Sequence, residues 1–596
     1  MRSTADRRRM LAVSGTVLAL VISLAGCTGT ETRVETPDPG PDPQVVIGAA
    51  SELTSFNPAA AQQDTDINAQ IYYATHETFG YLDDTLQIVQ NDGFGTLEKI
   101  SDDPLTVKYT LNKDLKWSDG QPITADDLLF GWAASSGYFD DATLGSDGQI
   151  VSGTRYFTPA STPSGFRDTA VPVVSDDKLT LTLTYDLPTP DWNVNWLVSQ
   201  PLHVVAQKAG LTAQSLLAAI RTTPKGIPTK PETPDATLLA AADVWNKGFA
   251  ATSLPSDPAL YVSNGPFVVE SWVPGTSMTL VANPNYHGSR TPKFSRLIYR
   301  FSLGTDELVE GLRDHDLDII SPLATGETRD SLQAIEGAEV LSGGLLAYTH
   351  FDVQYAGAYT DPDVREALLK VVPRKDLVDE LVHPVDPEGA PLNSLVYPVA
   401  QSEQYKSAVS QNGSDAYADV DLAGAKTLLA GRTPTLRILY DTGDPQSAAV
   451  FAATRAAATE AGFEVVDVGT TQWRSELGGD GYDAVIAVSA SQAVDNGLIP
   501  SVFASEGANN DTGVNIPQVN KLSLSLQTMT DPQAVEAASI KVDALLFKNH
   551  YGLPLFQHPG IIAHSDRVAG VSFMAGPAGP LWNFWRWSVS AASPAP

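Results

Sequence analysis

The amino-acid sequence predicts a mixed α/β fold, and three patterns along the chain indicate it. Residues 45–49 form a short apolar run that closes with small residues, which is typical of a buried strand. Residues 179–185 alternate leucine or tyrosine with threonine, the pattern of a half-buried strand. Residues 436–468 read as a strand, an alanine-rich helix that ends at Gly462, and a second strand. That order predicts a βαβ unit with a parallel strand pair.

The other expected elements agree with this fold class. Residues 105–111 alternate like a strand, and residues 482–488 form a further apolar run near the βαβ unit. Two polar stretches that contain proline and glycine, residues 140–168 and 221–236, predict surface insertions. A length of 596 residues favours about four domain-sized units. Helices are expected at residues 125–135, 363–370, 422–430 and 532–547.

The N-terminus has the features of an export signal. Four arginines precede a mostly apolar run at residues 10–24, and Leu-Ala-Gly-Cys follows, with Cys27 the single cysteine of the chain. This ending resembles the lipobox of bacterial lipoproteins, which implies a signal peptide at residues 1–26 and a diacylglycerol on the Cys27 sulfur. The alternative is a chance thiol in an ordinary secretion signal. Arg8 and Arg9 leave both Sec and twin-arginine export open.

The residues after the signal predict a linker, and the single cysteine limits the thiol chemistry of the mature protein. Residues 27–43 are rich in proline and polar side chains, so they predict an extended, lipid-anchored linker. One cysteine excludes an intrachain disulfide, a thiol nucleophile apart from the lipidated residue, and a thiolate metal site.

The net charge of the chain limits which molecules it can bind. The chain has 38 Lys and Arg against 70 Asp and Glu, a formal net charge of −32. Such a surface repels phosphate backbones and anionic lipid, so no nucleic-acid partner is expected. Beyond the signal there is no apolar run of 18 residues, so contact with the membrane is expected through the lipid alone.

Enzyme and metal motifs give no support to catalysis. Nucleophile-elbow, phosphate-loop, dinucleotide and zinc-protease patterns do not occur. Residues 64–68 and 314–318 superficially resemble calcium loops, but Ala69 and Ile319 replace the glycine that the turn needs. His76 beside Glu77 is expected to be a satisfied structural residue. The sequence therefore predicts a protein that is not an enzyme and has no cofactor.

Residues 117–127, Trp-Ser-Asp-Gly-Gln-Pro-Ile-Thr-Ala-Asp-Asp, predict a tight turn followed by a helix that Thr124 caps. The same string resembles the signature of the family 5 solute-binding proteins of ABC importers, the oligopeptide- and dipeptide-binding group, here of an actinobacterial type. Further segments agree in order over about residues 45–590: they lie at residues 51–58, 264–267, 283–286, 312–319, 363–368, 374–376, 481–483 and 554–556.

The resemblance implies a two-lobed clamshell, the type II-like periplasmic-binding-protein fold of the large peptide-binding cluster, with an extra inserted domain. A hinge between lobes lets such a protein close on a ligand. Mapped onto this chain, lobe I takes residues 44–85, 186–300 and 560–596, the inserted subdomain takes 86–185, and lobe II takes 301–559.

The resemblance also implies where a ligand lies. Peptide members hold the ligand main chain between the lobes by strand-like hydrogen bonds. Carried over, the lobe I edge falls on Glu52, Leu53 and Thr54, and Phe130 stands where a tyrosine often covers the ligand. Trp473 falls on a pocket tryptophan, with a core aromatic as the alternative. The lobe II edge falls on Ala487, Val488 and Ser489.

The lobe II edge departs from the family pattern. Ser489 replaces an expected tryptophan, and Gln492 stands where an aspartate pairs with the α-amino group of the peptide. Asp495 is the nearest acidic replacement, so it is the candidate anchor for that group.

The function that the resemblance implies is an extracytoplasmic lipoprotein, monomeric and anchored to the cell membrane, that delivers peptides to an ABC permease. Two alternatives keep the fold: a lipoprotein that regulates assembly of the cell envelope, and a binder of a nickel chelate or a sugar.

Overall fold

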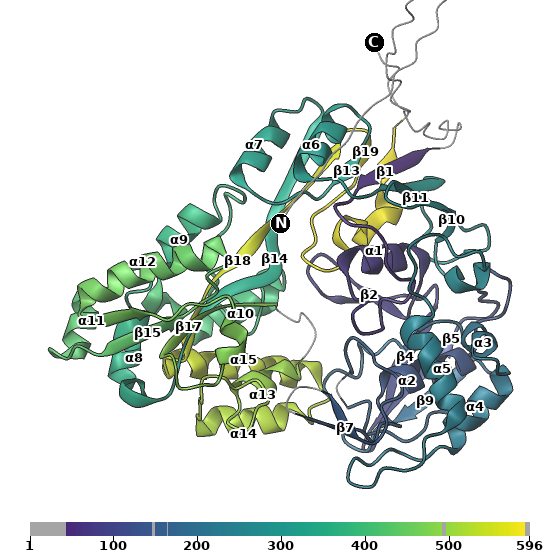
Figure 1. The fold of residues 1–596 in the computed structure, drawn as a ribbon, viewed down its shortest axis with the longest axis horizontal. Coiled ribbons are helices and arrows are strands. Elements are labelled where there is room, and N and C mark those ends of the chain that lie inside the picture. Colours follow the sequence, from purple (N-terminus) through teal and green to yellow (C-terminus); the bar gives the residue numbers. More distant parts are fainter. Residues whose placement is uncertain (1–42, 146–148, 164, 491–495, 591–596) are drawn as a thin grey trace, which may run out of the picture. The chain divides into compact units, whose positions relative to one another are not determined.

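The computed structural model describes residues 43–145, 149–163, 165–490 and 496–590. Its largest sheet has ten strands in the order β10-β11-β12-β1-β13-β18-β14-β17-β15-β16 (Figure 1). The first strand, β1 (Gln44–Gly48), pairs in parallel with β12 (Arg296–Arg300) and with β13 (Ile319–Ile320). Val45 and Ile47 of β1 are buried, so the predicted buried strand is confirmed.

The predicted βαβ unit is also present. Strands β15 (Thr435–Leu439) and β16 (Glu464–Asp467) pair in parallel, and α12 (Pro445–Ala461) connects them. The helix ends at Gly462, whose φ of 116° is a left-handed conformation that residues with a side chain rarely adopt. β17 (Ala484–Ala490) pairs in parallel with β15 from the other side, so the apolar run expected there is a buried strand.

Two long strands in the middle of the sheet were not expected from the sequence. β14 (Ala338–Val353) and β18 (Gly552–Ser565) pair antiparallel over most of their length, with two register irregularities. Pro559 of β18 lies opposite Gly344 beside one irregularity, and Pro554 lies beside the other. Because the irregularities interrupt the ladder, a central strand can hold prolines that would otherwise argue against it.

A separate four-stranded sheet has the order β4-β5-β9-β8. It consists of β4 (Gly95–Asp102), β5 (Leu105–Leu111), β9 (Thr180–Thr184) and β8 (Val173–Val174). The helix α2 (Ala125–Ser135) has the predicted bounds, and the alternating patterns correctly predicted β5 and β9. All these elements lie within the predicted inserted subdomain.

The segment that carries the family signature is a turn that leads into α2. Asp119 accepts a hydrogen bond from the Gln121 backbone N–H at 3.0 Å, and Gly120 between them has a φ of 86°. At the start of α2, the Thr124 backbone N–H donates to the Asp127 carboxylate at 2.9 Å. The signature residues therefore build a capped turn, as their chemistry predicts.

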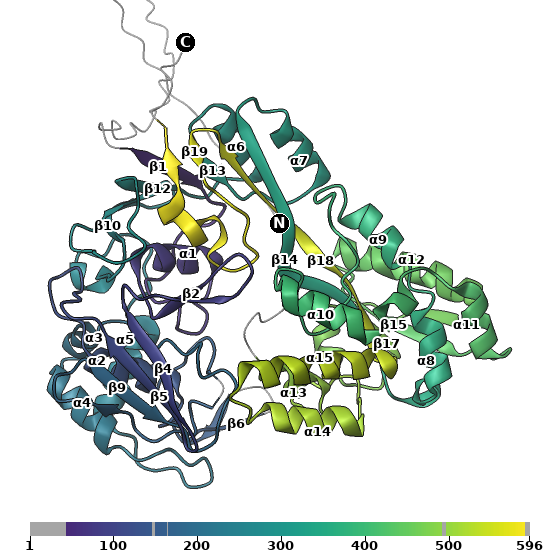
Figure 2. The same ribbon diagram turned by 180° about the vertical axis from the view of Figure 1, so that it is seen from behind.

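The remaining helices and strands connect these sheets. The predicted helices near residues 363, 422 and 532 are confirmed as α8, α11 and α15, and Figures 1 and 2 both place α13, α14 and α15 together. The helices not yet given are α1 (Asp66–Thr75), α3 (Leu202–Lys208), α4 (Ala213–Thr222), α5 (Ala236–Lys247), α6 (Thr305–Arg313), α7 (Gly326–Gln333), α8 (Pro362–Leu369), α9 (Arg374–Leu381), α10 (Ser402–Asn412), α11 (Leu422–Leu429), α13 (Leu498–Phe503), α14 (Pro517–Leu526) and α15 (Pro532–Lys548), with short 3-10 helices η1 (Pro258–Tyr261), η2 (Gly357–Thr360), η3 (Ser414–Tyr417), η4 (Trp473–Glu476) and η5 (Gly579–Arg586). The strands not yet given are β2 (Gly80–Leu82), β3 (Ile88–Gln90), β6 (Thr143–Leu144), β7 (Ile150–Ser152), β10 (Phe267–Val273), β11 (Ser277–Ala282), β19 (Val568–Ala569) and β20 (Ser588–Val589).

Two large hydrophobic clusters pack against the ten-stranded sheet. The first contains Val45 and Trp587 but also Val107 of the separate sheet, so it is continuous through the predicted lobe I and inserted subdomain. The second contains Phe351 of β14 and Phe556 of β18, and lies within the predicted lobe II. The division into lobes and insert stays a prediction, because the described residues belong to one compact unit.

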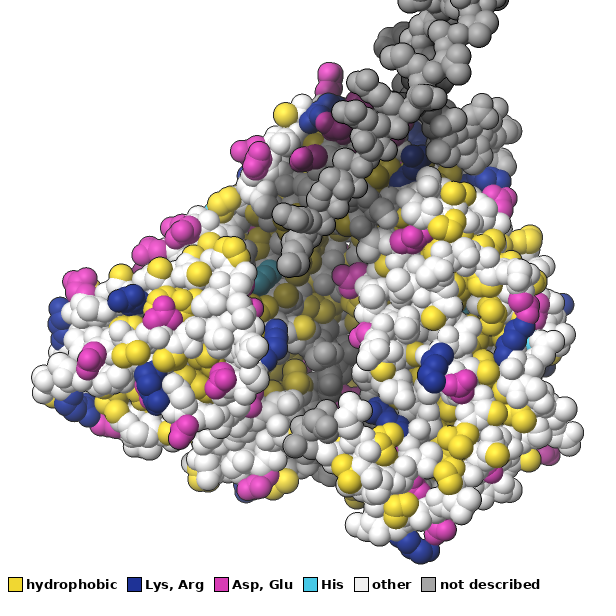
Figure 3. Space-filling view, viewed as in Figure 1, with side chains coloured by type: hydrophobic (Ala, Val, Ile, Leu, Met, Phe, Trp, Pro, Cys, Tyr) yellow, Lys and Arg dark blue, Asp and Glu magenta, His cyan; other side chains and the backbone are white. Residues whose placement is uncertain are grey.

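The face of the molecule drawn in Figure 3 carries side chains of both charges. Figure 3 shows Asp and Glu side chains spread over the visible face, with Lys and Arg among them. Within the described residues, no helix combines the length and the apolar character needed to cross a bilayer.

A buried ion pair lies in the region of the first cluster. The Arg290 Nε lies 3.3 Å from a carboxylate oxygen of Glu77, and the two side chains are 4% and 2% exposed. Arg290 also donates to the His76 backbone carbonyl at 2.7 Å, and Tyr286 donates its hydroxyl to Glu77. Burial lowers the pKa of His76 to about 3, so this histidine is a neutral core residue. Its Nε2 is buried with no hydrogen-bond partner among the described residues, so the side chain is not fully satisfied, contrary to the expectation.

Candidate ligand-binding site

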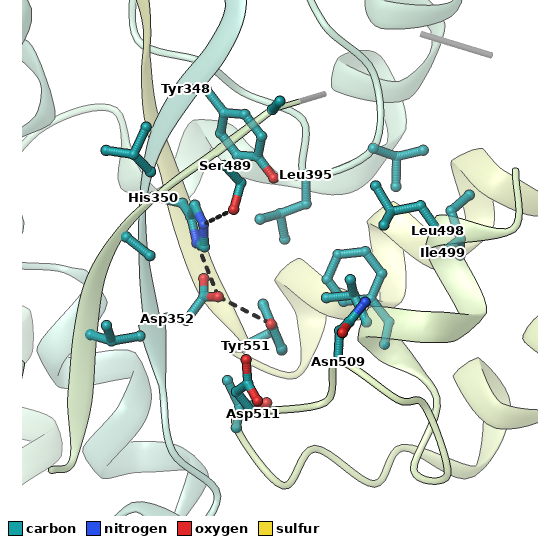
Figure 4. A pocket seen from close by; sticks show the side chains of 18 of the residues that line it. Tyr348, His350, Asp352, Leu395, Ser489, Leu498, Ile499, Asn509, Asp511 and Tyr551 are labelled. Carbon is teal, nitrogen blue, oxygen red and sulfur yellow. Dashed lines mark hydrogen bonds and ion pairs between the residues drawn. The ribbon is translucent and has the colours of Figure 1, made fainter. Parts of the chain in front are cut away.

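A cavity of about 550 Å³ lies within the part of the chain predicted as lobe II (Figure 4). Its size falls in the range of about 300–1,000 Å³ that small-molecule sites occupy. Strands β14 and β17 form one side, the short helix η4 adds Trp473, and α13 adds an apolar side. Tyr551, just before β18, lines it too, as do Asn509, Asp511 and Thr512 and several residues of the segment 395–401.

The wall that β17 forms has an open strand edge. Ala487, Val488 and Ser489 all line the cavity, and all three pair with β14. On its other side β17 pairs with β15 only at Ala484 and Val485. Beyond Val485 the described strands therefore leave this edge of β17 unpaired, and an unpaired edge offers N–H and C=O groups to an extended ligand.

A chain of hydrogen bonds runs across the strands at this wall. The His350 Nε2 lies 2.9 Å from the Ser489 hydroxyl, and its Nδ1 lies 3.0 Å from the Asp352 carboxylate. Tyr551 donates its hydroxyl to the same Asp352 oxygen at 3.1 Å (Figure 4). Because an ionised carboxylate only accepts hydrogen bonds, Nδ1 carries a proton, and the pair fixes the orientation of the imidazole and the serine.

The same wall holds acidic groups with few partners. The Asp352 side chain is 9% exposed, and its second oxygen, Oδ1, is buried with no hydrogen-bond partner among the described residues. Burial and the nearby charge of Asp352 raise the pKa of Asp511 above its usual value. Burial and the same charge raise the pKa of Tyr551 well above its ordinary value. Burial is the larger cause of both shifts, and the charge of Asp352 adds to it.

Trp473 lines the cavity and also belongs to a small core cluster. Its residue surface is 4% exposed, and it packs with Tyr482 and Val485. The guanidinium of Arg474 lies 4.4 Å from the centre of the indole, which is a cation–π contact. Both interpretations of this tryptophan, core aromatic and pocket wall, therefore describe part of its surroundings.

The cavity side opposite the acidic wall is apolar. The labelled Leu395, Leu498 and Ile499 lie there in Figure 4, and Val502 and Phe503 also line the cavity. A site with one acidic side and one apolar side favours a ligand of matching polarity.

The structure places the predicted lobe I residues away from this cavity. The Glu52 carboxylate accepts hydrogen bonds from the Trp272 indole N–H at 2.6 Å and from the Gly275 backbone N–H at 2.8 Å. The Thr54 backbone N–H donates to Asn68 at 2.9 Å, and its carbonyl accepts from Ala251. A strand-like bond from a ligand to the Thr54 main chain would have to replace these.

Leu53 and Phe130 are core residues in this structure. Leu53 is 2% exposed, and Phe130 is fully buried with its ring in an edge contact with Phe157. A ligand role for either residue, and for Glu52 and Thr54, stays a prediction. The residues that do line the cavity together are Trp473, Ala487, Val488 and Ser489.

Three residues that the sequence analysis singled out lie outside the described residues: Cys27, Gln492 and Asp495. The predicted anchor for a peptide amino group is therefore untested. Sequence reasoning did not single out Asp352 and Asp511. Nothing in the sequence separates them from the other acidic residues, and the strand that holds Asp352 was itself not predicted.

The calcium-like segments have structural roles. Thr65 and Asp66 begin α1, and Asp314 ends α6. No cluster of three or more His, Cys, Asp or Glu side chains that could hold a metal ion occurs in the part of the chain that the structure describes.

Comparison with known proteins identifies the fold and the family. The model of the bacterial extracellular solute-binding proteins, family 5 Middle, matches residues 91–510. The chain belongs to this family. Family 5 proteins bind solutes and are not enzymes, and the chain has their mixed α/β periplasmic-binding-protein fold.

Three similar proteins can be compared with this family 5 protein. An uncharacterized lipoprotein of Mycobacterium tuberculosis is 24% identical, over 97% of this chain and 98% of the relative. The oligopeptide-binding protein OppA of the same species is 22% identical, over 93% of this chain and 90% of the relative. The solved structure of the periplasmic EDTA-binding protein EppA has a TM-score of 0.70 at 18% identity, over 94% of this chain and 98% of that one.

Proposed function

We propose that this family 5 protein is an extracytoplasmic lipoprotein that captures a peptide and delivers it to an ABC permease in the membrane. The observation that carries the proposal is the open edge of β17 beside the cavity. Every peptide presents the same backbone donors and acceptors, so an open edge can bind many sequences. The family and the OppA relative support a peptide, and the lipoprotein relatives support the anchor at Cys27.

The acidic wall of the cavity weighs against one alternative ligand. EDTA, which the structural relative EppA binds, carries several carboxylates. Asp352 and Asp511 would repel such an anion, and unpaired like charges in a buried site are strongly unfavourable. A regulatory role in envelope assembly stays a second possibility, because the lipoprotein relatives are themselves uncharacterized.

Native mass spectrometry of the gently purified protein tests the proposal. A peptide that co-purifies, is released by unfolding and rebinds to the refolded protein is the expected result. Uptake of that peptide should then require both the protein and Cys27. A co-purifying molecule that is not a peptide, or peptide uptake that is unchanged when the protein is removed, would contradict peptide import.

A further inference from the structure

We infer that Asp352 and Asp511 form an acidic subsite of the cavity that binds a protonated amine or guanidinium group of the ligand. This inference deepens the proposed function, because it names the charge of the ligand that the same cavity takes. It concerns residues on β14 and on the loop after α13, not the family position that Gln492 occupies.

The first support is the state of Asp352. Its side chain is more than nine-tenths buried, yet one of its oxygens has no hydrogen-bond partner among the described residues. The other oxygen already accepts bonds from His350 and Tyr551. A buried carboxylate oxygen without a donor costs free energy, so such an oxygen at a cavity wall marks a place where a ligand donor fits.

The second support is Asp511, which comes from a different segment. Its carboxylate lies at the cavity wall and accepts no hydrogen bond from the described residues, and Figure 4 draws it near Tyr551. Partial burial and, after it, the charge of Asp352 raise its pKa, which means that the ionised form lacks a compensating partner. A ligand cation placed between the two carboxylates would satisfy both.

The positively charged side chains of the cavity do not already take the place of such a ligand cation. Arg474 is exposed and stacks on Trp473, and among the described residues it forms no ion pair with either acid. His350 contacts one Asp352 oxygen through Nδ1 and the Ser489 hydroxyl through Nε2, so both its nitrogens are used. The remaining oxygen of Asp352 and the carboxylate of Asp511 therefore have no positive partner among the described residues.

The apolar side of the cavity limits which cation fits. Leu395, Leu498 and Ile499 face the same space as the acidic wall (Figure 4). A hydrated metal ion gains nothing from that side, whereas an ammonium next to an aliphatic chain matches both sides. In a peptide, either the α-ammonium followed by an aliphatic residue or a lysine side chain supplies this chemistry.

Calorimetry with three synthetic peptides separates these sources. Trileucine has an α-ammonium, N-acetyl-trileucine has none, and N-acetyl-lysyl-dileucine has only the lysine ammonium. The full purified chain is expected to bind trileucine, the lysyl peptide or both at least about tenfold more tightly than N-acetyl-trileucine, since a hydrogen bond to a charged group changes affinity by about 10- to 150-fold. Hexylamine and hexanol repeat the comparison without a peptide main chain.

Two variants and a matched control assign the effect to the subsite. Asp511→Asn should remove most of the preference for the cation while leaving the thermal midpoint equal or higher, because the variant also removes repulsion from Asp352. Asp352→Asn should also remove most of the preference for the cation. Its stability can fall, because the charge next to His350 and Tyr551 is lost. Asp330→Asn changes the same charge at an exposed position of α7 and should change nothing.

The inference is overturned if no cationic probe binds better than its neutral partner, or if Asp511→Asn leaves the preference intact. Equal binding of all three peptides would reject the acidic subsite and leave peptide capture standing. If no peptide binds and hexylamine behaves like hexanol, the subsite is also rejected. Native mass spectrometry then decides the proposed function independently.

Discussion

Replacing Trp473 by alanine should destabilise the protein by about 4 kcal/mol, and the structure supplies the magnitude. Its residue surface is 4% exposed, and a buried indole removes up to about 250 Å² from water. At about 25 cal/mol per Å² this area corresponds to about 6 kcal/mol. Residual burial in the unfolded chain reduces the value by roughly 10–40%, which leaves about 4 kcal/mol, within the usual range for Trp→Ala.

Because Trp473 lines the cavity, its replacement should affect both the stability of the fold and the affinity for the ligand. The void left by the indole joins the existing cavity, so water can enter it, and the cost should not exceed the estimate. A ligand that stacks on the indole loses a further contact, and binding should weaken by about 2 kcal/mol, or roughly thirtyfold. Both effects are expected together, because Trp473 belongs to a core cluster and also lines the cavity.

Urea unfolding monitored by circular dichroism, with calorimetry on the folded protein, measures the two effects separately. Trp473→Phe keeps an aromatic ring and should retain most of the stability. Arg474→Ala removes only the cation–π contact and should cost about 0.5–1 kcal/mol. The burial reasoning fails if Trp473→Ala changes the free energy of unfolding by less than about 1 kcal/mol. Normal ligand affinity in the folded variant would make Trp473 a core residue alone.

Three further outcomes are expected from other regions. Glu77→Gln should destabilise by about 3–5 kcal/mol in urea unfolding, because it leaves the buried Arg290 guanidinium uncompensated, and a loss below about 1 kcal/mol would contradict that reasoning. Burial raises the pKa of Asp543 to about 6, so its contribution is full below its unfolded value and is lost as the pH rises through 6. Relative to Asp543→Asn, the wild type should therefore gain about 2 kcal/mol in free energy of unfolding between pH 7 and pH 4, and parallel pH profiles would refute this. Cys27→Ser should move the protein from the detergent phase to the aqueous phase of a Triton extraction, and unchanged partitioning would reject the lipid anchor.

Local sequence patterns predicted those helices and strands in which the apolar spacing and the capping residues match the observed backbone. Residues 45–49, 105–111 and 125–135 have the apolar spacing and caps of their elements, and the structure has β1, β5 and α2 there. β14 and β18 were missed for the opposite reason. Gly343 and Gly344 interrupt the first strand and prolines the second, and only register irregularities between the two make that sequence compatible with a sheet.

Cavity residues could be predicted from the sequence only at positions that the family resemblance covers. Ala487, Val488, Ser489 and Trp473, which the resemblance singles out, line one cavity, and their contact with a ligand stays a prediction. Asp352 was not predictable in the same way, because its importance comes from an oxygen left without a donor, and that depends on which strands meet. An acidic residue in a chain of 70 Asp and Glu has no local signal for such a role.

The order of strands in the large sheet has a consequence for folding. β1, at the beginning of the described chain, lies beside β13, and β13 in turn pairs with β18, whose last residue is Ser565. The middle of the sheet therefore cannot close until nearly the whole chain has been made. Contacts so distant in sequence are typical of slow folding. C-terminal truncation before β18 should therefore yield no native central sheet, because β18 is the strand that joins β13 to β14.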